Sequence, residues 1–276
     1  MKICIVGAGA IGGFFGTKLA LVSKQGVATH AVSAFARGAT LSALQSHGWR
    51  LNTAAGLLQA PVAKASSQAA DLGVQDLVII AVKGQALAEV APSLAPLIDA
   101  NTLILPAMNG VPWWFCDAVQ GGVHGVQSVD ARLQSLDPTG IIAASLPMQQ
   151  VLGCVIHAST AQTEPGLVQH KMGQGVIVGE PAGDALQASQ RVARVVQALS
   201  DAGFDATHAS NIRYDIWYKL WGNMTMNPVS AITGATIDRV LGDKLVRGFC
   251  SSVMLEAQAI GARIGCKIDE SPEDRH

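Results

Sequence analysis

Short apolar runs alternate with segments of helical periodicity over residues 1–105. The runs are rich in β-branched residues and are bounded by Gly, Pro or Lys, which is typical of buried strands. We expect strands at Lys2–Val6, Thr29–Phe35, Asp76–Val82 and Thr102–Leu105. We expect helices at Ile11–Ser23, Ala39–His47 and Gln85–Leu97. This alternation predicts an α/β fold whose N-terminal part is a Rossmann-like, doubly wound parallel sheet.

The pattern changes in the second half of the chain. A hairpin is expected at Trp49–Ala63, and residues 133–179 hold β-rich pieces at Val151–Ala158, Leu167–Lys171 and Val176–Val178. Ala185–Ala202 is helical again, and from Asn211 onward the periodicity is helical with no strand. We therefore predict one domain over residues 1–209 and a smaller all-α domain over residues 210–276. Pro228 fits a helix stop.

Glycines follow the first predicted strand at a fixed spacing. Gly7-Ala8-Gly9-Ala10-Ile11-Gly12 is a complete G-x-G-x-x-G between a strand and a helix. In that position Gly7 permits the tight turn, Gly9 lets a pyrophosphate approach the backbone, and Gly12 lets the helix pack closely. The N–H groups of the helix N-terminus would bind the phosphates. The sequence therefore predicts a dinucleotide site, the alternative being a simple glycine-rich turn.

The end of the second predicted strand indicates which dinucleotide is bound. NAD-binding versions of this motif place a carboxylate there to hold the ribose 2′-hydroxyl. This chain has no acidic residue before Asp71, and its second strand is followed by Arg37. A guanidinium pairs well with a 2′-phosphate, so we expect the cofactor to be NADP(H). The alternative is that Arg37 is a solvated surface charge.

Lys219, Asn223 and Asn227 are spaced four residues apart in the helical region. At 100° per residue each step advances about 40°, so the three share one helix stripe. Asn is a poor helix former, which favours a functional reason for the pair. An ammonium can protonate the alkoxide that forms from a ketone, and amides can donate to carboxylate or hydroxyl groups. The alternative is a solvated polar face.

Polar residues also follow two predicted strands of the Rossmann-like part. Lys83 comes after the strand that ends at Val82, and Asn109 comes after the apolar run that ends at Met108. Ligands of such sheets bind at the carboxyl ends of the strands, so both are candidate site residues. Lys83 is otherwise a surface charge, and Asn109-Gly110 is otherwise a turn.

Composition narrows the function classes. The 276 residues carry a net charge of −1 and only 14% are charged, which gives no electrostatic footprint for nucleic acid or a membrane surface. No apolar run is long enough to span a bilayer. The five cysteines are scattered, as in reduced cytoplasmic proteins. The seven histidines show no ligand spacing with Cys or Asp, so no metal site is expected.

Five motifs together resemble the ketopantoate reductase (2-dehydropantoate 2-reductase) family, and the likeness extends from Met1 to about Ile268. The motifs are GAGAIGGFFG, ARGATLSAL, AVKGQ, MNGVPWW and NIRYDIWYKLWGNMTMNPVSAIT. The resemblance implies NADPH-dependent reduction of 2-dehydropantoate to (R)-pantoate in pantothenate biosynthesis. By similarity Lys219 is the general acid and Arg37 contacts the 2′-phosphate. The remaining matches are substrate contacts at Asn223 and Asn227, and nicotinamide and substrate contacts at Lys83 and Asn109.

The chain also departs from the family. Members continue with a segment that carries a serine and an acidic residue of the substrate site, whereas this sequence ends at His276, so the helical domain is expected to be cut short. MNGVPWW is longer than the loop of the best-known members. The alternatives are a related NADP-dependent dehydrogenase of another hydroxy or keto acid, and a non-catalytic NADP(H)-binding sensor. The chain could pair with a second copy of itself as a homodimer. The expected location is the cytoplasm.

Overall fold

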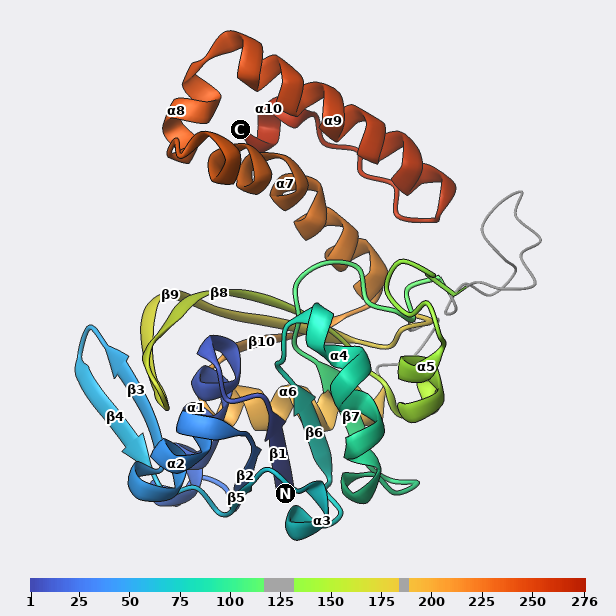
Figure 1. Ribbon diagram of the computed structural model, residues 1–276. Helices are drawn as coiled ribbons and strands as arrows, with labels where there is room; N and C mark the ends of the chain where they lie inside the picture. The colour runs from blue at the N-terminus through green and yellow to red at the C-terminus, as the bar shows by residue number, and fades with distance from the viewer. Residues whose placement is uncertain (117–131, 184–188) are drawn as a thin grey trace.

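The computed structural model describes residues 1–116, 132–183 and 189–276. Figure 1 shows a parallel sheet with its helices, a second sheet beside it, and a layer of helices from the C-terminal part. This arrangement confirms the predicted α/β class with a smaller helical part after it.

The first sheet is parallel throughout, with the strand order β5-β2-β1-β6-β7. Its central strand β1 is buried on both faces, since Ile3 and Ile5 belong to one apolar cluster and Cys4 and Val6 to another. Burial on both faces explains why these strands read as apolar runs without alternation. The strands are β1 (Lys2–Val6), β2 (Ala31–Phe35), β5 (Ala65–Ser66), β6 (Leu77–Ile80) and β7 (Leu103–Pro106).

Helices connect these strands. They are α1 (Ala10–Lys24), α2 (Gly38–His47), α3 (Ala69–Leu72) and α4 (Gly84–Val90). The prediction of one α-helix over Gln85–Leu97 was wrong beyond Val90, because a 3₁₀ helix, η1 (Ala91–Leu97), takes over. Pro92 and Pro96 lie in that segment, and each lacks the N–H that would continue the α-helical hydrogen bonding.

The second sheet combines residues that are distant in the sequence. Its order is β10-β9-β3-β4, and β8 pairs antiparallel with β9. The predicted hairpin is confirmed as β3 and β4, but the pieces expected at Leu167–Lys171 and Val176–Val178 form a single strand. Gly173, at φ +73°, lies close to the carbonyl of His157 where the register shifts, so the strand bends there without ending. The strands are β3 (Trp49–Thr53), β4 (Gly56–Ala60), β8 (Gly153–Glu164), β9 (Leu167–Gly179) and β10 (Asp205–Ala209).

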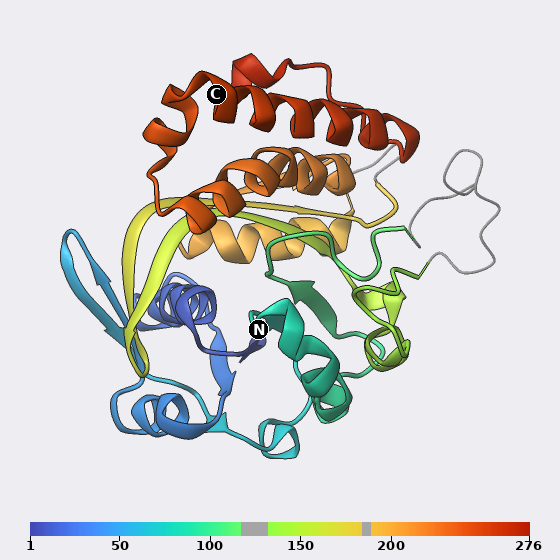
Figure 2. The same ribbon diagram turned by 45° about the horizontal axis from the view of Figure 1, so that its top comes forward.

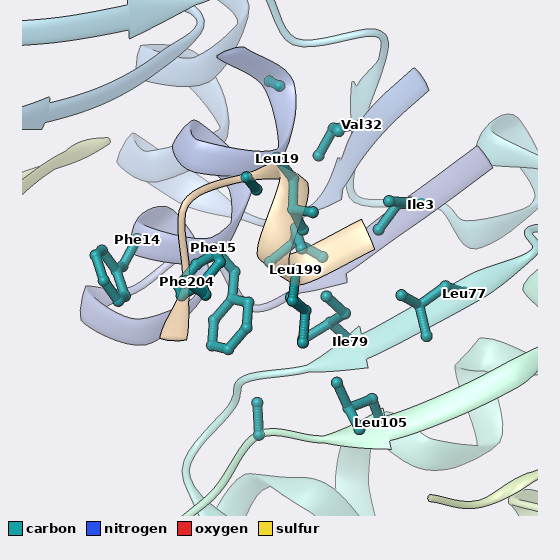
Figure 3. Packing of buried hydrophobic residues seen from close by; sticks show 14 of the residues in the cluster. Ile3, Phe14, Phe15, Leu19, Val32, Leu77, Ile79, Leu105, Leu199 and Phe204 are labelled. Atoms are coloured by element: carbon teal, nitrogen blue, oxygen red, sulfur yellow. The ribbon is translucent and has the colours of Figure 1, made fainter. Parts of the chain in front are cut away.

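An aromatic core joins the two sheets through α1. Figure 3 shows Phe14 and Phe15 of α1 beside Phe204, with Leu199 facing the first sheet. The rings of Phe15 and Phe204 stack with centroids 4.8 Å apart. Leu199 belongs to α6 (Gln190–Asp201), which starts after the N-cap Ser189. The first residues of the helix expected at Ala185–Ala202 lie outside the described residues.

The helical layer begins at α7 (Ile212–Thr233), which lies along β8 and β9 (Figure 2). Two buried indoles tie α7 to α9 (Lys244–Arg263), because Trp217 Nε1 donates to the Ala257 carbonyl at 3.3 Å and Trp221 Nε1 to that of Met254 at 2.8 Å. Four shorter helices complete the described elements. They are α8 (Ile237–Gly242), α10 (Pro272–Arg275), α5 (Ile141–Ser145) and the 3₁₀ helix η2 (Met148–Gln150).

Pro228 does not end α7. The helix continues to Thr233 and ends at Gly234, which adopts the left-handed conformation and donates to the Ser230 carbonyl at 2.8 Å. The prediction of a stop at Pro228 was therefore wrong. A proline removes only one N–H donor from the helix, and the residues after Pro228 keep helical geometry, so α7 continues.

The sheets and the helical layer share one apolar cluster, which includes Ile80 and Trp114 as well as Trp217 and Met254. The buried guanidinium of Arg213 reinforces this junction by donating to the carbonyls of Phe115 at 2.9 Å and Ile264 at 2.8 Å. Strand β10 ends at Ala209, and no strand follows it among the described residues. The division at residues 209 and 210 stays a prediction. None of the described helices is long and apolar enough to cross a membrane.

We expect Gly16→Ala to destabilise the protein and Gly248→Ala to stabilise it. A Cβ at Gly16 would lie 2.4 Å from the Trp49 ring, whereas a Cβ at Gly248 on α9 meets nothing within 4 Å. Overpacking costs about 1–3 kcal/mol, and removing an unconstrained helical glycine contributes roughly 0.5–1 kcal/mol. Urea unfolding of both variants measures the difference, and equal shifts in the free energy of unfolding would contradict this packing.

Candidate active site

The glycine loop between β1 and α1 turns tightly and leaves open space at the start of the helix. Gly7 adopts φ +89°, and a Cβ there would lie 2.7 Å from the Val82 side chain. A Cβ at Gly12 would lie 2.0 Å from the Gly7 carbonyl oxygen, so the loop closes tightly. Gly9 instead faces open space, since the nearest atom to a Cβ there is Gln162 Oε1 at 3.9 Å. No side chain caps α1, so its first N–H groups face this space.

Arg37 stands at the end of β2 and is the N-cap residue of α2. It lines a cavity of about 380 Å³, the Arg37 cavity, together with Gly7, Gly9 and Thr40. Its guanidinium pairs with the Glu89 carboxylate of α4 at 2.9 Å, and both side chains are largely exposed, at 75% and 67%. Exposed pairs of this kind contribute only about 0–1 kcal/mol, so either partner is readily available to a ligand.

The ammonium of Lys219 lies where three elements meet. It donates to Asn109 Oδ1 at 2.7 Å, beyond the end of β7, and to the carbonyl of Ile156 on β8. Lys219 itself projects from α7. Residues that are separated by 110 positions in the sequence are therefore in direct contact, as the proposal of a shared site requires.

A cavity of about 770 Å³, the Lys219 cavity, gathers most of the residues singled out from the sequence. Its wall contains Gly9 to Ile11, Lys83, Asn109, Lys219 and Asn223. Asn227 does not line it. That residue lies one helical turn further, in an adjoining recess of about 310 Å³ that Asn109, Lys219 and Asn223 also line. The stripe predicted on α7 thus faces the two connected spaces.

Burial sets the protonation of two groups at this site. Partial burial lowers the pKa of the Lys219 ammonium from its usual range. Burial raises the pKa of the neighbouring Cys154 thiol to about 12, although the charge of Lys219 opposes this. Cys154 therefore lines the recess as an uncharged thiol. Lys219 is a cation that releases its proton more easily than an exposed lysine.

Three further residues line the site that the sequence analysis did not identify. His157 and Gln162 of β8 line the Lys219 cavity, and Glu89 meets Arg37 in the Arg37 cavity. Burial lowers the pKa of His157, and the charges of Lys219 and Arg275 lower it further, so the ring stays neutral at neutral pH. All three approach the glycine loop only through tertiary contacts of β8 and α4, which spacing along the chain does not reveal.

The described residues contain no group of three or more His, Cys, Asp or Glu side chains placed to hold a metal ion. The polar groups of the two cavities are instead amides, lysines, the ring of His157, hydroxyl groups such as that of Thr40, and one ion pair. Such groups suit an organic anion and a carbonyl compound.

Comparison with known proteins identifies the family of the chain. Family models described as "Ketopantoate reductase PanE/ApbA" and "Ketopantoate reductase PanE/ApbA C terminal" match residues 3–113 and 211–275. A 2-dehydropantoate 2-reductase of Mesorhizobium japonicum is 39% identical over 267 residues, which cover 97% of this chain and 78% of that relative. The chain belongs to the ketopantoate reductase family. Among the site residues of the sequence analysis, Gly7–Gly12 lie in or just before α1, and Lys219, Asn223 and Asn227 lie on α7. Arg37, Lys83 and Asn109 lie elsewhere in the chain.

Solved structures give the same result for the fold. A ketopantoate reductase structure from Ralstonia solanacearum is 51% identical, with a TM-score of 0.90, and the match covers 99% of this chain and 80% of that one. A 2-dehydropantoate 2-reductase from Porphyromonas gingivalis, at 22% identity and a TM-score of 0.80, shares the fold over 99% of this chain and 86% of its own.

We expect the Lys219 ammonium to titrate below, and that of Lys267 above, the ordinary lysine pKa of 10.5. Burial lowers the pKa of Lys219, whereas the exposed Lys267 gains a hydrogen bond and an ion pair from Asp269 that raise its pKa. The ¹³Cε resonances of labelled lysines, followed against pH, measure both, and Lys219→Gln identifies the signal. A Lys219 midpoint at or above that of Lys267 would contradict the geometry described for the site.

Proposed function

We propose that the protein reduces a 2-keto acid with NADPH, and that the substrate is 2-dehydropantoate, which becomes (R)-pantoate on the way to pantothenate. The single observation that carries the proposal is the contact of Lys219 with Asn109 in a cavity bordered by the glycine loop. Membership of the ketopantoate reductase family supports it. The same family membership favours a cytoplasmic biosynthetic enzyme.

The residues present fit a dinucleotide. The open space over Gly9 leaves room for a pyrophosphate at the uncapped N-terminus of α1. Gly9 and Val82 line both the Lys219 cavity and the Arg37 cavity, so one extended molecule can occupy the two. When bound, the dihydronicotinamide would supply a hydride to the carbonyl carbon of the substrate.

The chain's own residues would do the rest of the chemistry. Lys219 gives its proton to the carbonyl oxygen, and its lowered pKa favours this transfer. Asn109 accepts from the ammonium and so keeps it aimed into the cavity. Asn223 and Asn227 present amides along the same helix face for the carboxylate or hydroxyl groups of the substrate. The resulting neutral amine then takes up a proton from water, which restores the ammonium.

The choice of NADPH over NADH rests on Arg37. Its ion pair with Glu89 is largely exposed, so a 2′-phosphate can take the place of the carboxylate at little cost. Glu89 is also the one observation in favour of NADH, because a carboxylate in this cavity can accept from a ribose hydroxyl. The forked, permanently charged guanidinium makes the phosphate the better partner.

Arg37→Ala should weaken NADPH binding and leave NADH binding nearly unchanged. A charge-assisted pair contributes about 1.5–3 kcal/mol, which corresponds to roughly tenfold or more in affinity. Titration of both cofactors by fluorescence measures the effect. Arg194→Ala is the matched control, because Arg194 is also exposed and paired, with Asp76 at 3.8 Å, but lies outside the cavities. Equal affinities of the parent for NADPH and NADH would rule out the assignment of Arg37.

Lys219→Ala should lower turnover by roughly 10²–10⁴-fold, the contribution of a positioned general acid. NADPH affinity should survive, because the glycine loop and Arg37 hold the phosphates. Lys219→Arg should also fail, since a guanidinium keeps its proton. Initial rates with saturating NADPH and 2-dehydropantoate measure this, with Lys267→Ala as the control for an exposed lysine.

More than about a tenth of parental turnover in Lys219→Ala would show that this residue is not the acid. A much lower melting temperature would show that it is structural. A parent that binds NADPH but oxidises it with no 2-keto acid would instead favour a cofactor-binding sensor.

A further inference from the structure

A cavity of about 370 Å³ lies away from the proposed reaction site, where α1, the hairpin β3–β4, β9 and the end of α6 meet. We call it the Lys18 pocket. None of its lining residues lines the Lys219 cavity, the Arg37 cavity or the recess at Asn227. Sites that enclose small organic molecules start at volumes of about 300 Å³. The pocket is therefore large enough for a small ligand of its own.

The wall of the pocket contains a partly buried cation. Lys18 of α1 donates from Nζ to the Gly203 carbonyl at 2.6 Å and to Gln174 Oε1 at 3.2 Å. The ammonium also lies over the ring of Phe204, 4.5 Å from its centroid. These three partners are uncharged, and burial lowers the pKa of the ammonium although the charge of Asp205 opposes this. An ammonium has three N–H donors, so Lys18 can donate one more hydrogen bond to an anion.

The pocket also contains a carboxylate. Asp201, the last residue of α6, lines it and accepts from Gln197 Nε2 at 2.7 Å. A carboxylate can accept about four hydrogen bonds, and the C-terminus of a helix attracts positive charge as well. Although both side chains are described, Asp201 and Lys18 form no ion pair with each other. The pocket therefore offers one group for an anion and a separate group for a cation.

Part of the wall is apolar and only partly covered. Leu51 of β3 and Leu58 of β4 lie directly opposite each other in the hairpin, so their side chains share one face. Leu51 is 1% exposed, whereas Leu58 is 36% exposed where it lines the pocket. Leu21 of α1 lines the pocket and is also partly exposed. An apolar group placed here would remove more of these leucine side chains from water, which is favourable.

We propose that the Lys18 pocket binds an α-amino acid with an apolar side chain. The α-carboxylate of the ligand accepts from the ammonium of Lys18, and its α-ammonium donates to the carboxylate of Asp201. Its side chain lies against Leu21 and Leu58. A simple carboxylic acid would leave Asp201 without a cation, and a simple amine would leave Lys18 without an anion. The zwitterion is the ligand that pairs both groups, and its binding does not depend on the proposed function.

Calorimetry with leucine and two of its analogues tests the class of ligand. 4-Methylpentanoate keeps the carboxylate and the side chain of leucine but lacks the ammonium, and 3-methylbutylamine lacks the carboxylate. We expect leucine to bind more tightly than either analogue by about tenfold or more, because each analogue loses one charge-assisted pair. No leucine binding, or an analogue that binds as tightly as leucine, would overturn the proposal.

Two substitutions test whether leucine binds in the pocket. Lys18→Met removes the cation but keeps a long, flexible side chain, and Asp201→Asn removes the anion but keeps an oxygen for Gln197. Each should weaken leucine binding by about tenfold or more. Lys267→Met and Asp269→Asn are the matched controls, because this exposed pair lies outside the pocket. Parental leucine affinity in folded Lys18→Met and Asp201→Asn would show that leucine binds elsewhere and would overturn the proposal.

Leu58→Trp repeats the test without removing a charge, in case Lys18→Met melts early. Leu58 is on the partly exposed strand β4, so a larger side chain there narrows the pocket without entering the core. Leucine binding should again weaken by about tenfold or more. Leu57→Trp is the control, since Leu57 precedes it on the same strand, is 56% exposed and does not line the pocket. Equal leucine affinities of the two variants would contradict the assignment.

Discussion

The partly buried ammonium of Lys219 is the interaction around which the protein is arranged. A charge removed from water needs oxygen partners, and here they come from Asn109 beyond β7 and from the backbone of β8. The lysine itself is on α7, so one cation links the helical layer to the loop that follows β7 and to β8 of the second sheet. The same contacts place it beside the glycine loop. The atom that makes these structural contacts is therefore also the one that we propose as the proton donor.

The proposed cofactor site depends on a different constraint, which is the close packing around Gly7 and Gly12. Because those positions leave no room for a side chain, β1 turns directly into α1 and the helix N-terminus faces open space above Gly9. That space borders both the Arg37 cavity and the Lys219 cavity. The glycine loop, the ion pair of Arg37 and the lysine thus border two adjoining cavities, as the proposed dinucleotide requires.

Local pattern predicted the elements well where one helix or strand determines the outcome. Strand β1, the hairpin β3–β4 and the stripe of Lys219 and Asn223 on α7 follow from periodicity and turn residues alone. The pattern was misleading where tertiary context decides. Helix α7 passes through Pro228, and β9 bends at Gly173 instead of ending. Glu89 reaches Arg37 from another helix, and a contact of that kind has no signature in spacing.

The hydrogen bonds of Arg213 have a consequence for how the helical layer can move. Its guanidinium lies over the ring of Phe115, 4.8 Å from the centroid, and bonds to backbone on either side of the junction. The backbone at Phe115, in the loop that follows Asn109, is therefore hydrogen-bonded to α7 of the helical layer. If the helices shift when a ligand enters, that loop travels with them as one body. A ligand that displaces the helical layer would then also move the amide of Asn109, which contacts Lys219.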